Sequence, residues 1–235
     1  MAADPRGRMD DLGTPVLDDH LHLDPDAGRG LDAVTDFRRL GGTHLLVVNK
    51  PSWHLGVEVE TGAEFRAVFE RTLAVVARAD EALPGRAWPV LGVHPGLISR
   101  LVDDRGLDPA AAGELMRAGL DVAAEYVADG RALALKSGRP HYEVPDAVWA
   151  AANETLRHAL ALGARHDCAV QLHTETTEDL TAVAAWARER GLAPERVVKH
   201  YAGEALAGPT PSVMCRKGWL SAHAERGEPF LMETD

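Results

Sequence analysis

Cysteine is scarce in this sequence, and long apolar stretches are missing from it. Cys168 and Cys215 are the only cysteines among 235 residues, which excludes a disulfide-stapled scaffold and favours a reducing, cytoplasmic compartment. No apolar run approaches the roughly 18 residues that a membrane-spanning helix needs. Residues 1–13 are polar and lack the apolar segment of a secretory signal. We expect residues 1–14 to form a flexible tail ahead of one domain, residues 15–235.

Positive charge is also in short supply. The chain has 25 Lys and Arg against 36 Asp and Glu, which gives a net charge of −11. Duplex binding depends on neutralising phosphates with Lys and Arg, so this balance works against a broad nucleic-acid footprint. A small or end-bound anionic substrate held by a metal is still compatible with it. DNA is therefore a possible substrate that the charge does not favour.

What the sequence does contain is a series of short apolar strands that alternate with helical segments. Such alternation predicts parallel strands joined by right-handed crossovers. Eight strands favour a closed TIM-type (β/α)8 barrel over an open sheet, and such barrels commonly form a single domain. The predicted strands are 17–22, 43–48, 88–93, 132–136, 168–173, 196–200, 211–215 and 229–233, and the predicted helices are 30–40, 61–83, 107–129, 145–162, 178–190 and 217–226.

Chemically active side chains lie at the ends of these strands. In a parallel barrel the carboxyl ends of all strands open on one face, where the active sites of this fold lie. In the first strand, His20 and His22 project to the same side because successive side chains alternate between faces. The other residues at or just beyond predicted strand ends are Lys50, His54, His94, Lys136, Arg139, His141, His173, His200 and Asp235.

Three imidazoles and a carboxylate form the predicted metal site. His20, His22, His173 and Asp235 suit Zn²⁺, with Mn²⁺, Co²⁺ or Mg²⁺ as alternatives. His200 is either a ligand of a second metal or the base beside a single one. A metal-bound water, acidified towards neutral pH, is the predicted nucleophile, and Asp235 is a natural acceptor for its proton. Taken alone, the His-x-His pair is equally compatible with two ordinary strand histidines.

Other polar residues around this face are candidates for substrate binding. Arg139 and His141 follow the fourth strand, and a guanidinium suits the recognition of phosphate or carboxylate. Lys50 and His54 follow the second strand. There they either contact an anionic group of the substrate or belong to a solvated turn closed by Pro51.

Six short motifs occur in order along nearly the whole chain: DDHLHLDP, GVHP, GRPHYEV, QLHTET, VVKHY and LMETD. In this order they resemble the TatD-like metal-dependent hydrolases of the amidohydrolase superfamily, and GGTHLLVVNKPSWH with SGRPHYEV is most similar to a TatD-related branch common in archaea. The resemblance implies a TIM-type barrel, one or two divalent metals and hydrolysis, usually of DNA phosphodiesters. It also implies His20 and His22 as first-strand ligands, His173 as the fifth-strand ligand, His200 as ligand or base, Asp235 as ligand and proton acceptor, and His94 as a substrate-facing residue.

The fourth strand departs from the family pattern. Typical TatD proteins have a metal-bridging Glu in a Gly-Glu-x-Gly run, where this chain has Leu135-Lys136-Ser137-Gly138. Lys136 is either carboxylated on its amine, as in phosphotriesterase-like and dihydroorotase-like relatives, or an ammonium that contacts substrate or Asp235; a role outside the site is a third reading. A carbamate restores a bridging carboxylate and a two-metal site. A free ammonium favours a single metal, because two divalent ions would repel it.

The end of the sequence is a second departure. Family members continue past the ETD motif for several tens of residues, including a helix that covers the last strand. If that helix buried roughly 400 Å² of apolar surface, its loss would forgo on the order of 10 kcal/mol, which is comparable to a domain's whole stability. We therefore expect one of two explanations for the missing last helix. Either the chain is truncated or the product of a fragmentary gene, or a partner or a second copy in an oligomer covers the exposed last strand.

Two alternatives to phosphoester hydrolysis stay open. The same ligand set serves amidohydrolase, lactonase or deaminase chemistry on C–N or carboxylic ester bonds. The altered fourth strand and the missing C-terminal segment also fit a catalytically silent barrel with a binding role.

Overall fold

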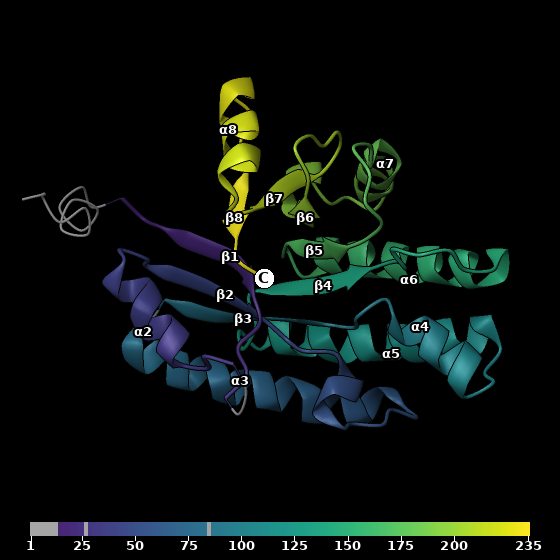
Figure 1. The fold of residues 1–235 in the computed structure, drawn as a ribbon. Coiled ribbons are helices and arrows are strands. Elements are labelled where there is room, and N and C mark those ends of the chain that lie inside the picture. Colours follow the sequence, from purple (N-terminus) through teal and green to yellow (C-terminus); the bar gives the residue numbers. More distant parts are fainter. Residues whose placement is uncertain (1–13, 26–27, 84–85) are drawn as a thin grey trace, which may run out of the picture.

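Eight parallel strands form a nearly closed barrel in the computed structural model, which describes residues 14–25, 28–83 and 86–235 (Figure 1). Each strand pairs with the next one along the chain. The predicted TIM-type barrel is therefore confirmed, while residues 1–13 of the predicted tail lie outside the described residues. The strands are β1 Leu17–Leu21, β2 His44–Val48, β3 Ala87–Gly92, β4 Ala134–Gly138, β5 Val170–His173, β6 Val197–Ala202, β7 Thr210–Met214 and β8 Leu231–Glu233.

Helices lie on the outside of the barrel (Figure 1). None of the helices described combines the length and the apolar character that crossing a membrane requires. Within the described chain, β8 is the last element and no helix follows it. The helices are α2 Asp32–Arg39, α3 Phe65–Ala82, α4 Leu97–Ser99, α5 Pro109–Ala128, α6 Asp146–Arg165, α7 Thr181–Glu189 and α8 Lys217–Arg226, with 3₁₀ turns at Ser52–Leu55, Gly62–Glu64 and Pro194–Arg196 and a π-helical turn at Arg100–Asp104.

The long helices α3, α5 and α6 each bury one apolar face, and side-chain caps mark the start of α5 and of the turn before α3. Asp108 accepts a hydrogen bond from the backbone N–H of Ala110 at the start of α5, and Pro109 occupies its first position. Ahead of α3, Thr61 and Glu64 form a reciprocal capping box. Apolar side chains of α3, α5 and α6 then pack against β3, β4 and β5 in one continuous core. This core holds the strands rigidly beneath the face on which they end.

The fourth strand begins two residues later than predicted. The backbone N–H groups of Arg131 and Ala132 both donate to Tyr126 O, at 2.8 and 3.1 Å, because they complete the turn that ends α5. The prediction of a strand over 132–136 is therefore wrong by two residues at each end. Lys136 consequently lies in the middle of β4, inside the barrel, and not at its mouth.

The barrel closes at a seam between β1 and β8 that differs from the other strand pairs. No ladder of strand pairing joins these two strands in the described chain. Asp18 instead accepts two hydrogen bonds from Thr234, one from its Oγ1 at 2.5 Å and one from its backbone N at 3.2 Å. The backbone N–H of Asp235 donates to His20 O at 2.9 Å. The seam thus holds Thr234 and Asp235, the two residues after β8, directly beside β1.

Candidate metal centre

His20 and His22 present the same ring nitrogen to the barrel mouth. The Nδ1 atom of His22 lies 2.9 Å from Val48 O, and a carbonyl only accepts, so this Nδ1 carries the proton. The Nδ1 atom of His20 lies 2.9 Å from the side-chain oxygen of Gln171, whose amide nitrogen donates to Asp19 O at 2.7 Å. Both imidazoles are therefore anchored through Nδ1 and offer Nε2 as a ligand, the usual arrangement of metal-binding histidines.

Asp235 lies opposite these two nitrogens. Its Oδ1 atom is 4.0 Å from His20 Nε2 and 3.8 Å from His22 Nε2. Atoms bound to one ion at about 2.0–2.2 Å are separated by roughly 3–4 Å, and the three ligand atoms all lie within 4.8 Å of one another. The two nitrogens and the carboxylate thus fit a single divalent ion.

A second possible ligand group shares His20. The His20 ring stacks on that of His200, with the ring centroids 3.7 Å apart. His200 Nδ1 lies 3.0 Å from Glu233 Oε2, and the fully buried Glu233 also accepts hydrogen bonds from Ser212 Oγ and from the backbone N–H of Tyr201, both at 2.8 Å. His20, His200 and Glu233 offer ligand atoms within 4.8 Å of one another. Sequence reasoning did not include Glu233 in the ligand set, although it has the same strand parity as Asp235.

Lys136 reaches the centre from β4. Its Nζ atom lies 3.1 Å from His20 Nε2, and the side chain is buried. Burial lowers the pKa of Lys136 to about 8, against the opposing effect of Asp235 and Glu233. As an ammonium, Lys136 donates to the lone pair that His20 would offer to a metal. A metal and a charged Lys136 therefore compete for the same nitrogen.

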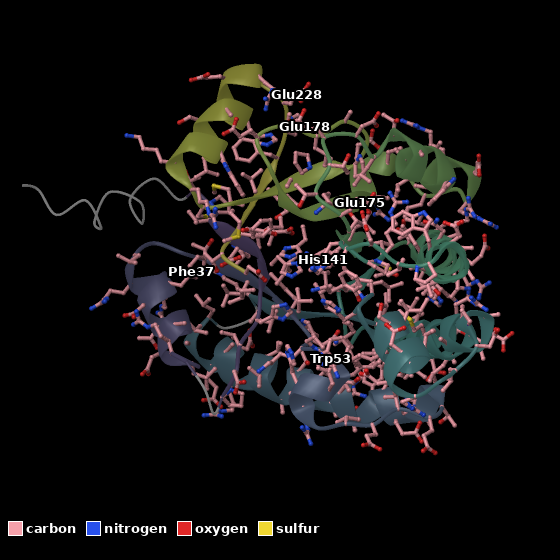
Figure 2. The ribbon with its side chains drawn as sticks, turned by 45° about the vertical axis from the view of Figure 1, so that its right-hand side comes forward. Phe37, Trp53, His141, Glu175, Glu178 and Glu228 are labelled. Atoms are coloured by element: carbon pink, nitrogen blue, oxygen red, sulfur yellow. The ribbon has the colours of Figure 1, made fainter. Side chains whose placement is uncertain are left out.

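His173, His94 and His141 form a separate arc beside this centre. His173 Nε2 lies 3.0 Å from His141 Nδ1, and the ring centroids of His173 and His94 are 4.7 Å apart. The His173 ring is 5.5 Å from that of His200. His173 belongs to neither three-ligand group found among the described residues. Figure 2 shows His141 near the middle of the molecule.

Burial keeps these imidazoles in the form that binds metals. It lowers the pKa of His22, His94 and His200 to about 3. It also holds the pKa of His20 and His173 well below the usual value. All five rings are neutral at pH 7, and a neutral imidazole is the species that coordinates a metal.

The remaining predicted residues lie around the rim. Arg139 Nε donates to Glu175 Oε2 at 2.8 Å and its Nη1 donates to Asn153 at 3.1 Å. Its guanidinium thus joins the segments after β4 and β5, and contact with substrate stays a prediction. Lys50 forms an ion pair with Asp24, whereas His54 is exposed.

A sequence model of the TatD-related DNases matches residues 17–214, which is most of the chain. The chain belongs to the TatD-related DNase family. The resemblance seen in the motifs is thereby confirmed. A similar protein is the uncharacterized protein MJ1127 of the archaeon Methanocaldococcus jannaschii, which is 30% identical over 231 residues, or 94% of this chain and 79% of the relative.

Solved structures similar to this TatD-family barrel are much more distant in sequence. A lactonase, Lmo2620, from Listeria monocytogenes superposes with a TM-score of 0.58 at 11% identity, over 94% of this chain and 78% of the lactonase. A triple mutant of an organophosphorus hydrolase from Deinococcus radiodurans superposes with a TM-score of 0.57 at 12% identity, over 94% of this chain and 75% of the hydrolase. At these identities the likeness establishes the fold. The TatD-family chain is thus a TIM barrel of a hydrolase family, with residues able to hold a divalent ion at its mouth.

Proposed function

We propose that this TatD-family chain is a divalent-metal-dependent hydrolase that cleaves a phosphoester bond in a small or end-bound anionic substrate. The observation that carries the proposal is the meeting of His20, His22 and Asp235, with both imidazoles anchored through Nδ1. This donor set suits Zn²⁺ first, and Mn²⁺, Co²⁺ or Mg²⁺ second. A divalent ion held there supplies a water acidified towards neutral pH.

Two side chains of the centre are suited to moving protons. The Asp235 side chain is 39% exposed, so it is accessible to the attacking water and accepts its proton. The His200 imidazole is oriented by Glu233 through Nδ1. It serves as a ligand of a second ion or, through its other nitrogen, as a base beside the first. His173 lies outside both three-ligand groups, so it completes the predicted ligand set only if it moves towards the centre.

The proposal assigns Lys136 a carbamate. Carboxylation requires a neutral amine, and burial of Lys136 lowers its pKa to about 8, so roughly a tenth of the amine is neutral at pH 7 and can react. The amine attacks carbon dioxide, a C–N bond forms, and the amine proton leaves to solvent. The product is an anion in place of the ammonium beside His20 Nε2, and it adds a carboxylate to the ligand set. This change removes the competition between Lys136 and a metal.

Substrate binding is assigned to the rim of the mouth. His94 and His141 flank His173, with ring centroids 4.7 and 5.0 Å from it. Lys50 and His54 follow β2, and the Trp53 ring contacts those of both His54 and His94. Arg139 contributes by holding the segment after β4 in place through Glu175. The net charge of −11 disfavours long DNA, so the phosphoester is expected in a small molecule or at a strand end.

The test is hydrolysis of bis(4-nitrophenyl) phosphate and of a γ-lactone by the full chain, before and after a chelator and again with added Zn²⁺. The proposal predicts that the phosphodiester is cleaved, that the chelator abolishes cleavage and that Zn²⁺ restores it. His22→Ala is expected to be inactive. His158→Ala is the matched control, because His158 pairs with Asp121 away from the centre. Equal phosphodiesterase activity of wild type and His22→Ala would reject the mechanism, and cleavage of the lactone alone would reject the phosphoester assignment.

A further inference from the structure

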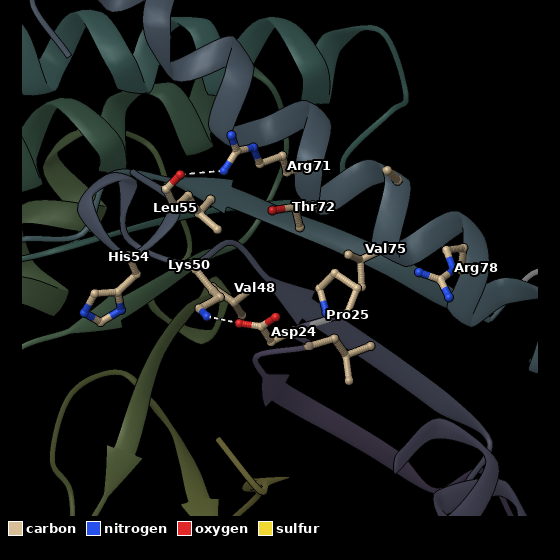
Figure 3. Close-up of a pocket in the computed structure, with 12 residues that line it drawn as sticks. Asp24, Pro25, Val48, Lys50, His54, Leu55, Arg71, Thr72, Val75 and Arg78 are labelled. Atoms are coloured by element: carbon tan, nitrogen blue, oxygen red, sulfur yellow. Dashed lines mark hydrogen bonds and ion pairs between the residues drawn. The ribbon is translucent and has the colours of Figure 1, made fainter. Parts of the chain in front are cut away.

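A cavity of about 550 Å³ lies between α3 and the segments that follow β1 and β2 (Figure 3). Its volume falls within the roughly 300–1,000 Å³ of typical small-molecule sites. The segments after β1 and β2 leave the strands at their carboxyl ends, which is the end of the barrel that carries the metal centre. One end of the cavity therefore lies at that end of the barrel, and its lining continues along α3 from Arg71 to Arg78.

The cavity is adjacent to the His22 side of the centre. Val48 lines the cavity, and its carbonyl oxygen accepts a hydrogen bond from His22 Nδ1 at 2.9 Å. Leu23, which directly follows His22 in the chain, is also part of the lining. The cavity thus borders two residues that adjoin His22, a proposed metal ligand.

Cationic side chains gather around this cavity. Lys50, Arg71 and Arg78 line it, whereas Asp24 is the one carboxylate among its described lining residues. Lys50 pairs with Asp24, and Arg71 donates to Leu55 O at 2.5 Å. This excess of positive charge is notable in a chain whose net charge is −11.

Arg78 is the cation available to a ligand. It is exposed on α3, and no hydrogen bond or ion pair joins it to another residue within the described part of the chain. Arg71 and Arg78 are two helical turns apart on one face of α3, with Thr72 and Val75 between them, as Figure 3 shows. An anionic group near Arg78 would gain a charge-assisted hydrogen bond without breaking an existing ion pair.

The rest of the lining is largely apolar. A purely inorganic anion would leave this apolar surface in contact with water, whereas an aryl or alkyl body would cover it. The cavity therefore fits a molecule that has both an apolar body and an anionic group. The apolar lining residues are Leu23, Pro25, Val48, Leu55, Ala74 and Val75.

We infer that this cavity binds the apolar body and a terminal anionic group, carboxylate or phosphate, of an amphiphilic substrate whose scissile ester lies at the metal centre. As a statement about substrate, the inference rests on the proposed hydrolase function. It adds Arg78 and the apolar wall of α3 to the substrate-binding residues. It also narrows the substrate class from any small anion to an organic anion with an apolar part.

Binding to the full chain, measured by calorimetry, tests this inference independently of catalysis. The probes are phenyl phosphate and 3-phenylpropionate, with inorganic phosphate and 2-phenylethylammonium as comparisons. We expect both aryl anions to bind at least about tenfold more tightly than either comparison, and Arg78→Glu to weaken them by about tenfold. Arg188→Glu is the matched control, since it makes the same charge change at an exposed site on α7. The tighter of the two aryl anions identifies the preferred anionic group.

Three results would overturn the inference: equal binding by Arg78→Glu and Arg188→Glu, equal binding of the ammonium probe, or loss of binding in His22→Ala with binding retained in Arg78→Glu. The last would place the probe on the metal centre. Arg78-dependent binding by a protein that hydrolyses nothing would support the cavity while rejecting the proposed function. Circular dichroism of each variant verifies that the fold is retained.

Discussion

At the scale of single residues, the candidate centre depends on which atom each side chain is free to offer. Gln171 anchors His20 of β1 through Nδ1, and Val48 anchors His22, which follows β1, in the same way. This leaves Nε2 of His22 directed towards Asp235. His20 has the same orientation, but its Nε2 is in contact with Lys136. The state of Lys136 therefore decides whether His20 is available to a metal.

Isotope labelling tests the state of Lys136. In protein loaded with Zn²⁺ in the presence of ¹³C-bicarbonate, we expect one carbamate carbon resonance that is absent from Lys136→Met. Lys199→Met is the matched control, because burial also lowers the pKa of Lys199 to about 8 while its Nζ bonds to a backbone carbonyl. The resonance should persist in that variant. Its absence from metal-loaded wild type, or its persistence in Lys136→Met, would contradict the assignment.

Residue patterns in the sequence predict part of this centre. Strand parity places His20 and His22 on one face, and the topology of a barrel brings Asp235 to them. Parity does not reveal that Glu233 holds His200, or that Arg139 is engaged by Glu175. Those contacts depend on side-chain rotamers and on neighbours from distant strands, which a single sequence does not specify.

At the scale of elements, the register between β3 and β4 places Lys136. Gly92 of β3 pairs with Lys136, and a Cβ atom on Gly92 would lie 1.8 Å from Lys136 O and 2.8 Å from Lys136 N. Only glycine permits the two backbones to approach so closely. The sequence predicts both ends of β4 two residues too close to the N-terminus. Nothing in the local pattern shows that Arg131 and Ala132 complete the turn after α5.

Substitution of Gly92 tests the importance of this close approach. We expect Gly92→Ala to lower the free energy of unfolding by more than about 2 kcal/mol, because β3 and β4 must separate to admit the methyl group. Gly218→Ala is the control: no atom lies within 4 Å of its added Cβ, and α8 should gain about 0.5 kcal/mol. Urea denaturation measures both. Equal stabilities of the two variants would show that the register tolerates a side chain at Gly92.

At the scale of the whole molecule, the barrel closes by joining the two ends of the described chain. The order of eight alternating strands and helices is visible in the sequence, and it gives the fold correctly. The seam is not visible there, because Asp18 and Thr234 are 216 positions apart and interact mainly through the Asp18 side chain. Since Asp235 directly follows Thr234, the seam also positions a proposed ligand.

Removal of the Thr234 hydroxyl tests this coupling between barrel closure and metal binding. Thr234→Val leaves Asp18 Oδ2 without its donor, which should cost about 1–2 kcal/mol of stability, and displacement of Asp235 should weaken Zn²⁺ binding by about tenfold. Thr43→Val is the control, because Thr43 bonds to Val16 near the opposite end of β1. That variant should lose stability but keep its affinity in a chelator-competition assay. Equal loss of affinity in both variants would refute a specific role for the seam.

The central claim, that residues from both ends of the barrel sequence hold one divalent ion, is tested most directly by anomalous diffraction at the zinc edge from crystals of the metal-loaded protein. The account predicts a peak bounded by His20 Nε2, His22 Nε2 and an Asp235 carboxylate oxygen. A peak elsewhere, or none at this position in crystals saturated with Zn²⁺, would contradict it.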